Sequence, residues 1–205
     1  MKKTVGVVLF DGFELLDVFG PLEMFGQFSD IFSLLLISER GGEIRSHQGP
    51  RCLADVSLGT APMINLLVIP GGLGTRSEVH NPRLLAWLRW QSQRSELVMS
   101  VCTGSALLAK AGVLDGVQAT TNKKAFAWVA SQSDKVHWQK QARWVEDGKF
   151  WTSSGVSAGI DMSLAVMAKL IGEEAADHAA CCAEYDRHRD PSWDPFSKLY
   201  GLVDH

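Results

Sequence analysis

The sequence lacks the features on which several classes of protein depend. Its four cysteines include the adjacent pair Cys181 and Cys182 and show no framework spacing, so we expect reduced thiols and a cytoplasmic location. There are 20 lysines and arginines against 23 aspartates and glutamates, a net charge of −3 that gives no electrostatic reason to expect a nucleic-acid partner. Neither G-x-x-x-x-G-K-[ST] nor G-x-G-x-x-G occurs, so no phosphate-binding loop is predicted.

Long apolar runs are missing as well. The longest stretch without a charged side chain, from Val56 to Thr75, contains four glycines and two prolines, which does not suit a continuous membrane-spanning helix. Near the start of the sequence there is only the short run from Val5 to Phe10, which acidic Asp11 follows without a small-residue cleavage site. We therefore expect no secretory signal and no membrane partner.

The sequence does contain a regular alternation of strand-like and helix-like segments. Its 205 residues, 46% of them apolar, suit one globular domain that covers residues 1–205. The expected strands are 5–10, 32–37, 66–69, 97–101, 136–138, 142–146 and 150–153, with a small hairpin over 44–53, and the expected helices are 14–28, 82–94, 103–111, 123–131, 157–171 and 173–184. Gly20 and Pro21 are expected to break or kink the first helix. This alternation predicts an α/β fold with a mostly parallel, doubly wound sheet.

Cys102 lies where an apolar strand runs directly into a predicted helix. This arrangement is typical of a nucleophile elbow, in which a tight turn presents the side chain at the carboxyl end of the sheet. The free N–H groups of the first helical turn favour a thiolate and can bind an oxyanion, and Gly104 permits a close approach of a ligand or a neighbouring strand. The local pattern alone equally allows Cys102 to be a small buried apolar residue.

The same edge of the sheet is expected to carry a glycine loop and two carboxylates. Gly71 and Gly72 follow a buried strand, and their N–H groups are candidates for a second oxyanion donor, although a plain turn explains them equally well. Glu14 and Asp17 share a face of the first helix, and Asp17 stands in the more apolar surroundings. A buried carboxyl has a raised pKa and serves as a general acid, whereas an exposed one at a helix start merely interacts with the helix dipole.

Taken together, these segments resemble the ThiJ/PfpI superfamily, whose members have a flavodoxin-like sandwich fold. The matching segments are FDGFELLDVFGP at 10–21, IPGG at 69–72, SVCTGS at 100–105 and GVSAGID at 155–161. In detail the sequence is similar to the isocyanide hydratase branch. The resemblance implies that Cys102 is the nucleophile, Asp17 the acid and Thr103 a hydroxyl neighbour in the catalytic site. It also implies that Gly71 and Gly72 form the oxyanion loop.

The sequence departs from the superfamily pattern at two positions. Thr103 follows the cysteine where other branches have a histidine or a glycine-rich variant, and Asn122 stands twenty residues after Cys102, where many members have a histidine. Asparagine cannot act as a base, which puts protease, glyoxalase and deglycase chemistry in doubt. Hydration is less affected because it can proceed on the Cys102–Asp17 pair alone.

The resulting expectation is a cofactor-independent hydratase that converts a small isocyanide to an N-formamide. His178, Cys181 and Cys182 share a helix face, but packing explains them better than zinc, and no metal or cofactor is predicted. One alternative is a sensor in which Cys102 is oxidised to a sulfinate, and another is glyoxalase-type activity on 2-oxoaldehydes. A DNA-binding role is disfavoured because the sequence has no helix-turn-helix to assign. The resemblance also implies a homodimer.

Overall fold

The computed structural model describes residues 2–204 and has a seven-stranded sheet at its centre. The strand order is β10-β11-β7-β6-β1-β2-β5, in which β10 is antiparallel to β11 and all other neighbours are parallel. These strands are β1 (Lys3–Leu9), β2 (Phe32–Ser38), β5 (Val56–Ser57), β6 (Leu66–Ile69), β7 (Leu97–Ser100), β10 (Trp144–Asp147) and β11 (Phe150–Ser153). The predicted mostly parallel α/β fold is thereby confirmed.

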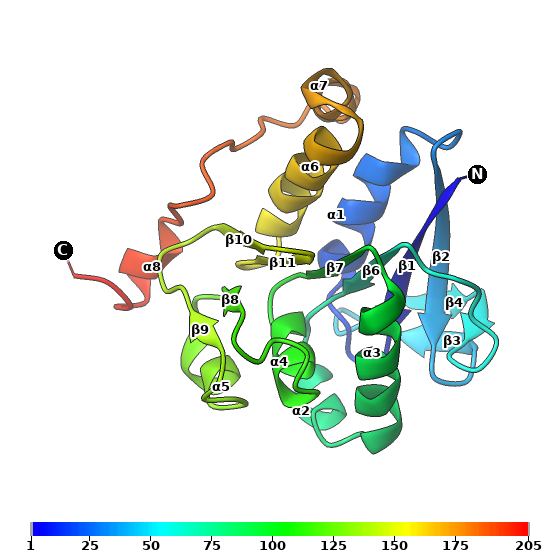
Figure 1. The fold of residues 1–205 in the computed structure, drawn as a ribbon, viewed down its shortest axis with the longest axis horizontal. Helices are drawn as coiled ribbons and strands as arrows, with labels where there is room; N and C mark the ends of the chain where they lie inside the picture. The colour runs from blue at the N-terminus through cyan, green and yellow to red at the C-terminus, as the bar shows by residue number, and fades with distance from the viewer. Residues whose placement is uncertain (1, 205) are drawn as a thin grey trace.

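Helices cover both faces of the sheet, as the continuous apolar strands require (Figure 1). One face carries α1 (Leu15–Gly26) and α6 (Ala158–Ile171), and α7 (Glu173–Cys182) packs mainly on α6. The other face carries α2 (Thr75–Glu78), α3 (Pro82–Arg94) and α4 (Gly104–Lys110). Every residue of β6 and β7 is buried between these two layers. The two strands that lead into the predicted site therefore lie at the centre of the core.

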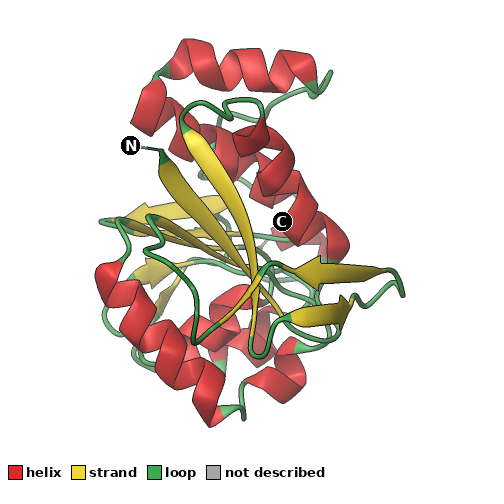
Figure 2. Cartoon of the chain, turned by 90° about the vertical axis from the view of Figure 1, so that its right-hand side faces the viewer, coloured by secondary structure: helices red, strands yellow, loops and turns green. Residues whose placement is uncertain are grey.

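Three smaller features surround this sandwich. The expected hairpin is present as β3 (Gly42–Arg45) and β4 (Arg51–Ala54), which stands away from the main sheet (Figure 2). A second small sheet pairs β8 (Gln118–Ala119) with β9 (His137–Trp138), next to α5 (Phe126–Ala130). The chain after α7 returns past the start of β10 and ends in α8 (Phe196–Leu199). On the way, the carbonyl of Pro191 accepts a hydrogen bond of 2.8 Å from the backbone N–H of Arg143.

The predicted break in the first helix is wrong. Helix α1 runs continuously through Gly20 and Pro21. It packs closely on α6 at this point, because a Cβ on Gly20 would lie only 2.8 Å from Ile160 Cγ1. The packing of α1 on α6 stabilises the helix across the proline. This stabilisation outweighs the loss of the one backbone hydrogen bond that proline cannot donate.

Other differences come from short elements with weak patterns. The helix expected over 123–131 begins only at Phe126, because Lys123 is held elsewhere by hydrogen bonds from its ammonium to Thr120 Oγ1 and the Ala142 carbonyl, each 2.6 Å. The strand expected over 136–138 forms part of the small β8–β9 sheet rather than the central one. Four elements were not predicted: β5, α2, β8 and α8. Within residues 2–204, no helix has both the length and the apolar character to cross a membrane.

Candidate active site at Cys102

Cys102 occupies the turn between β7 and α4 in a strained backbone conformation. Its φ angle is +56°, and Glu184 is the other non-glycine residue with positive φ in the described part of the chain. Such a conformation costs about 1–3 kcal/mol and persists only where the surroundings enforce it. Here the Cys102 N–H donates to the Ser154 carbonyl at 2.9 Å, and the Cys102 carbonyl accepts from Thr121 Oγ1 at 2.8 Å. The side chain is 6% exposed.

Asp17 is fully buried and reaches this turn from the first helix. Its Oδ2 accepts a hydrogen bond of 2.7 Å from the Gly71 N–H. Burial raises the pKa of Asp17 well above its ordinary value, and the charge of Glu14 raises it further, while hydrogen bonds from Gly71 and Cys102 act in the opposite direction. The carboxyl is therefore set up to hold a proton beside the thiol.

The cysteine sulfur is surrounded by hydrogen-bond donors as well as by this carboxyl. Burial raises the pKa of Cys102 above its ordinary value, and a charged Asp17 raises it further. The N–H groups of Val156 and Thr103 and the side-chain amide of Asn122 lower that pKa because they donate to the sulfur. When Asp17 carries the proton, its repulsion of the thiolate disappears while the three donors remain. A protonated Asp17 is thus the state in which these donors stabilise the thiolate best.

The glycines at 71 and 72 are required by the crowding around this pair. A Cβ on Gly71 would lie 2.5 Å from the Thr103 nitrogen and 2.9 Å from Asp17 Oδ2. A Cβ on Gly72, where φ is +122°, would lie 2.3 Å from the Gly12 carbonyl oxygen. Gly104 is likewise pressed against β6, since its Cβ would lie 2.2 Å from the Ile69 carbonyl oxygen. Only glycine permits these close approaches.

Thr103 connects the elbow to the glycine loop. Its hydroxyl accepts from the Gly72 N–H at 3.0 Å and from Thr75 Oγ1 at 3.1 Å. The amides of Gly71 and Gly72 therefore already hold Asp17 and Thr103 in place. The oxyanion role expected of these two amides stays a prediction, because an oxyanion would have to share them with those side chains.

A cleft of about 460 Å³ opens above Cys102. Its lining combines the predicted residues Cys102, Thr103 and Gly72 with four polar or charged side chains to which the sequence analysis gave no role in this site. These four are His47, Arg76, Asn122 and Lys124. Glu14 also lines the cleft, but its carboxylate accepts a hydrogen bond from Gln48. The structure thus brings Asp17, Gly71, Gly72, Cys102 and Thr103 together as predicted and adds these four side chains to the same cleft.

Asn122 is held in place by the helix that follows it. Its Oδ1 accepts a hydrogen bond of 2.9 Å from the Ala125 N–H. This bond orients the side chain so that the amide nitrogen donates to the Cys102 sulfur. Sequence reasoning considered Asn122 only as a missing base and therefore overlooked it as a donor. Its position twenty residues after the cysteine was the signal that pointed to it.

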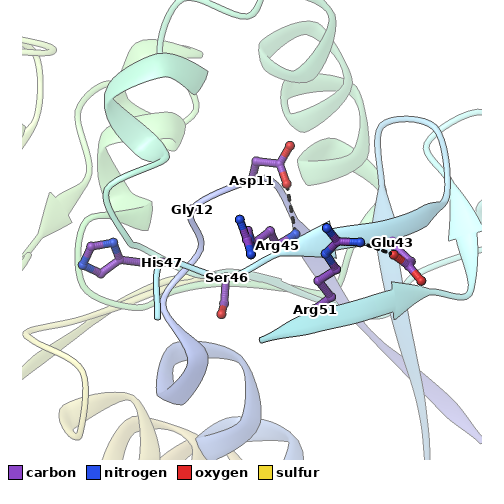
Figure 3. A pocket seen from close by; sticks show the side chains of 7 residues that line it. All are labelled: Asp11, Gly12, Glu43, Arg45, Ser46, His47 and Arg51. Atoms are coloured by element: carbon purple, nitrogen blue, oxygen red, sulfur yellow. Dashed lines mark hydrogen bonds and ion pairs between the residues drawn. The ribbon is translucent and has the colours of Figure 1, made fainter. Parts of the chain in front are cut away.

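A second hollow of about 530 Å³ lies at the β3–β4 hairpin rather than at the cysteine (Figure 3). Arg51 pairs with Glu43 at 2.9 Å, and Asp11 Oδ1 accepts a hydrogen bond of 3.0 Å from the backbone N–H of Arg45. Figure 3 shows His47 on the opposite side from the Arg51–Glu43 pair. Since His47 lines both hollows, the two adjoin.

The sequence profile of the DJ-1/PfpI family matches residues 3–169. The chain belongs to the DJ-1/PfpI family. An isonitrile hydratase from Pseudomonas putida is 28% identical over 185 residues, which cover 90% of this chain and 79% of the relative. The transcriptional regulator GbdR of Pseudomonas aeruginosa is 26% identical over 193 residues. The match covers 92% of this chain but only 52% of the regulator.

Solved structures of this family share the fold. Drosophila melanogaster DJ-1beta superposes with a TM-score of 0.80 at 22% identity, covering 91% of this chain and 100% of that one. A ThiJ/PfpI protein from Pseudomonas syringae superposes with a TM-score of 0.79 at 27% identity, covering 92% of this chain and 77% of that one. The flavodoxin-like architecture expected from the sequence is therefore confirmed.

Proposed function

We propose that this DJ-1/PfpI protein is a cysteine-dependent hydratase that acts on a small electrophile, with an isocyanide as the substrate and an N-formamide as the product. The observation that carries this proposal is the pairing of a buried carboxyl of raised pKa with the sulfur of a strained cysteine at the base of a cleft. The similarity to an isonitrile hydratase from Pseudomonas putida supports the choice of substrate.

The proposed reaction adds one water to the isocyanide in two stages. The Cys102 sulfur forms a bond to the terminal carbon, and Asp17 gives its proton to the same carbon, which yields a thioimidate and a charged carboxylate. Water then adds its oxygen to that carbon and one proton to the nitrogen. The C–S bond breaks with its electron pair returning to sulfur, and the remaining proton returns to Asp17. The N-formamide leaves, and the protein regains its starting protonation state.

The groups around the sulfur have distinct roles in this proposal. The amides of Thr103 and Val156 and the side chain of Asn122 stabilise the charged sulfur before attack and when it leaves. The Gly71 amide holds Asp17 toward the sulfur, and the Thr103 hydroxyl fixes the Gly72 loop. No step in this sequence needs a cofactor.

A sensor is the rival candidate, and one observation favours it. The chain is similar along 92% of its length to a part of the regulator GbdR. In a sensor, Cys102 would bind a ligand or be oxidised to a sulfinate next to Asp17 rather than turn over a substrate. Sustained turnover separates the two candidates.

The test is a panel of isocyanides and 2-oxoaldehydes incubated with the wild-type protein and with Cys102→Ser, while product is followed by mass spectrometry. We expect catalytic formation of the N-formamide by wild type and none by Cys102→Ser. Cys52→Ser is the control, because Cys52 lies on β4 outside the cleft lining, and it should retain the wild-type rate. Turnover of 2-oxoaldehydes alone would replace the hydratase with a glyoxalase-type enzyme, and no turnover of either class would favour the sensor.

We further propose that the protein works in the cytoplasm as a homodimer, with a small molecule as its substrate and no nucleic-acid or membrane partner. Helix α1 supports the dimer, since Leu16 and Phe19 are each 42% exposed on it. The same helix carries Asp17.

A further inference from the structure

One cation of the Cys102 cleft, the guanidinium of Arg76, stacks on an aromatic ring. Arg76 of α2 lies over the ring of Trp128 on α5, with the guanidinium carbon 3.4 Å from the ring centroid. Stacking of this kind fixes the plane of the guanidinium while its N–H groups remain free at the edges. Arg76 and Cys102 line the same cleft, so this cation shares the space into which the sulfur opens.

A second cation lies in the same cleft, and neither has a carboxylate partner. Lys124 precedes α5 and also contributes to the cleft lining. Among residues 2–204, no carboxylate lies within 4.0 Å of the charged nitrogens of Arg76 or Lys124; Arg40, Arg45, Arg89 and Arg94 also lack such a partner, but none of these four lines the cleft. Glu14, the one carboxylate of the cleft lining, accepts a hydrogen bond from the neutral amide of Gln48 and keeps its charge, so the lining carries two cations against one anion.

Electrostatics in this cleft therefore favour a negative ligand. Asp17 holds a proton and adds no charge, so Glu14 offsets only one of the two cations. Partial burial lowers the pKa of Arg76, although the residue as a whole is exposed. A stacked guanidinium with free N–H groups suits a carboxylate, which accepts two parallel hydrogen bonds from it.

We propose that the cleft selects substrates that carry a carboxylate at the end opposite to the reactive carbon, and that Arg76, with Lys124 beside it, binds this carboxylate. The assignment of the substrate as an isocyano-carboxylate rests on the proposed hydratase function. The charge preference itself is a property of the cleft and holds for any reagent that reaches Cys102.

The charge preference is tested by alkylation, which requires no turnover. Iodoacetate and iodoacetamide are similar in size and differ in charge, and their rates at Cys102 are measured separately by peptide mass spectrometry and normalised to glutathione. We expect the iodoacetate-to-iodoacetamide ratio at Cys102 to exceed that of glutathione and to fall about tenfold in Arg76→Gln, the effect of losing one charged hydrogen-bond partner. About 0.5 M salt should also lower the ratio in wild type, because it screens charges at the entrance.

Arg94→Gln is the matched control. Arg94 also stacks on a tryptophan, 4.1 Å from the Trp90 centroid, but on α3 outside the cleft lining, so its removal should leave the ratio unchanged. Lys124→Gln provides an independent variant if Arg76→Gln fails to fold. A ratio equal to that of glutathione in wild type, or one unaffected by both Arg76→Gln and Lys124→Gln, would refute the inference.

Substrate selection is then measured with isocyanoacetate and its methyl ester. We expect a higher kcat/KM for the anion in wild type, and a ratio of anion to ester that falls about tenfold in Arg76→Gln but not in Arg94→Gln. Equal kcat/KM values would overturn the substrate assignment. Absence of turnover with both compounds, combined with the alkylation preference, would remove the hydratase function while leaving the anion site in place.

Discussion

At the scale of single residues, the chemistry of Cys102 depends on groups from five separate segments. They are the first helix, the Gly71 loop, the elbow itself and the two loops that carry Asn122 and Val156. The carboxyl of Asp17 belongs to the first helix, while Val156 and Asn122 reach the sulfur from loops on its other side. The sequence pointed to Cys102 through the strand–cysteine–glycine pattern and to Asp17 through its apolar neighbours. The donors Asn122 and Val156 carry no such local signature, because a backbone amide or a neutral side chain looks the same in any loop.

Asp17→Asn should lower isocyanide hydration about 100-fold or more, the usual contribution of a general acid. The amide keeps the size of the carboxyl but cannot deliver a proton to carbon, and Cys102→Ala should abolish the reaction altogether. Initial rates of formamide production measure both effects, while alkylation of Cys102 verifies that its thiol stays reactive in Asp17→Asn.

Glu14→Gln is the matched control for Asp17→Asn. Its carboxylate lines the cleft but is bonded to Gln48, so the rate should change much less. A full rate in Asp17→Asn together with a collapse in Glu14→Gln would assign the acid to Glu14 instead.

Asn122→Ala should slow hydration by about tenfold and shift the pH profile of Cys102 alkylation toward higher pH. The variant removes one donor to the sulfur, and a hydrogen bond to a charged group contributes about 1.5–3 kcal/mol. This expectation revises the mild effect that the sequence alone suggests for an amide without a proton to transfer. The equivalent change Asn81→Ala removes the cap of α3 and should leave the alkylation profile in place. Identical profiles for wild type and Asn122→Ala would mean that the amide does not act on the sulfur.

At the scale of elements, a buried ion pair holds the loop that carries Val156. Arg143, just before β10, donates through Nε to Asp161 Oδ2 of α6 at 2.8 Å, and the two side chains are 7% and 0% exposed. Asp161 Oδ1 accepts from the His188 N–H at 2.9 Å, which ties in the segment after α7. The Ser154 N–H also donates to the Arg143 carbonyl at 2.8 Å, so the loop between β11 and α6, which carries Val156, is held at both of its ends.

Arg143→Met should lower the free energy of unfolding by about 3–5 kcal/mol, because it leaves the Asp161 carboxylate buried without its cation. Urea denaturation measures the loss. The double variant Arg143→Met with Asp161→Leu should recover part of it, since it removes the Asp161 charge but leaves the buried Asp194, whose Oδ2 lies 4.0 Å from Arg143 Nη1 in the wild type. A loss in Arg143→Met below about 1 kcal/mol, the range of exposed pairs, would contradict this role of the pair.

At the scale of the whole molecule, stability should depend on pH through a buried lysine. Burial lowers the pKa of Lys123 to about 8 in the folded protein, against an ordinary value of 10.5, although the charge of Asp194 opposes the shift. Between these values the unfolded chain binds more protons than the folded one, so the free energy of unfolding rises with pH over this window. Below about pH 8 the cost of keeping Lys123 charged and buried applies in full.

Lys123→Gln should flatten this rise. The measurement is the urea midpoint of wild type and variant at several values between pH 7.5 and 10, roughly the span from the folded to the unfolded pKa. Lys124→Gln is the control, because this neighbouring lysine is exposed. Parallel curves for Lys123→Gln and wild type would show that Lys123 does not titrate differently in the two states.

The proposed homodimer also belongs to this scale. Light scattering at micromolar concentration should give twice the mass of the 205-residue chain, and Phe19→Asp should lower it by placing a charge on the apolar patch of α1. Lys2→Asp changes charge on an exposed residue away from that helix and should leave the mass unchanged. A monomeric mass for wild type would end this proposal.

The sequence by itself determined the elements with strong periodicity and the residues that local patterns distinguish. Continuous apolar runs specified the central strands, and the strand–Cys102–helix junction specified the elbow, because both signals lie within a few neighbouring residues. The tertiary structure decided what depends on distant segments meeting. Packing of Gly20 on α6 keeps α1 continuous through Pro21, and the Gly71 and Gly72 amides bind Asp17 and Thr103. The fold also brings the cations Arg76 and Lys124 into the cleft that Cys102 lines. Packing and electrostatic fields arise between segments, and no local pattern encodes them.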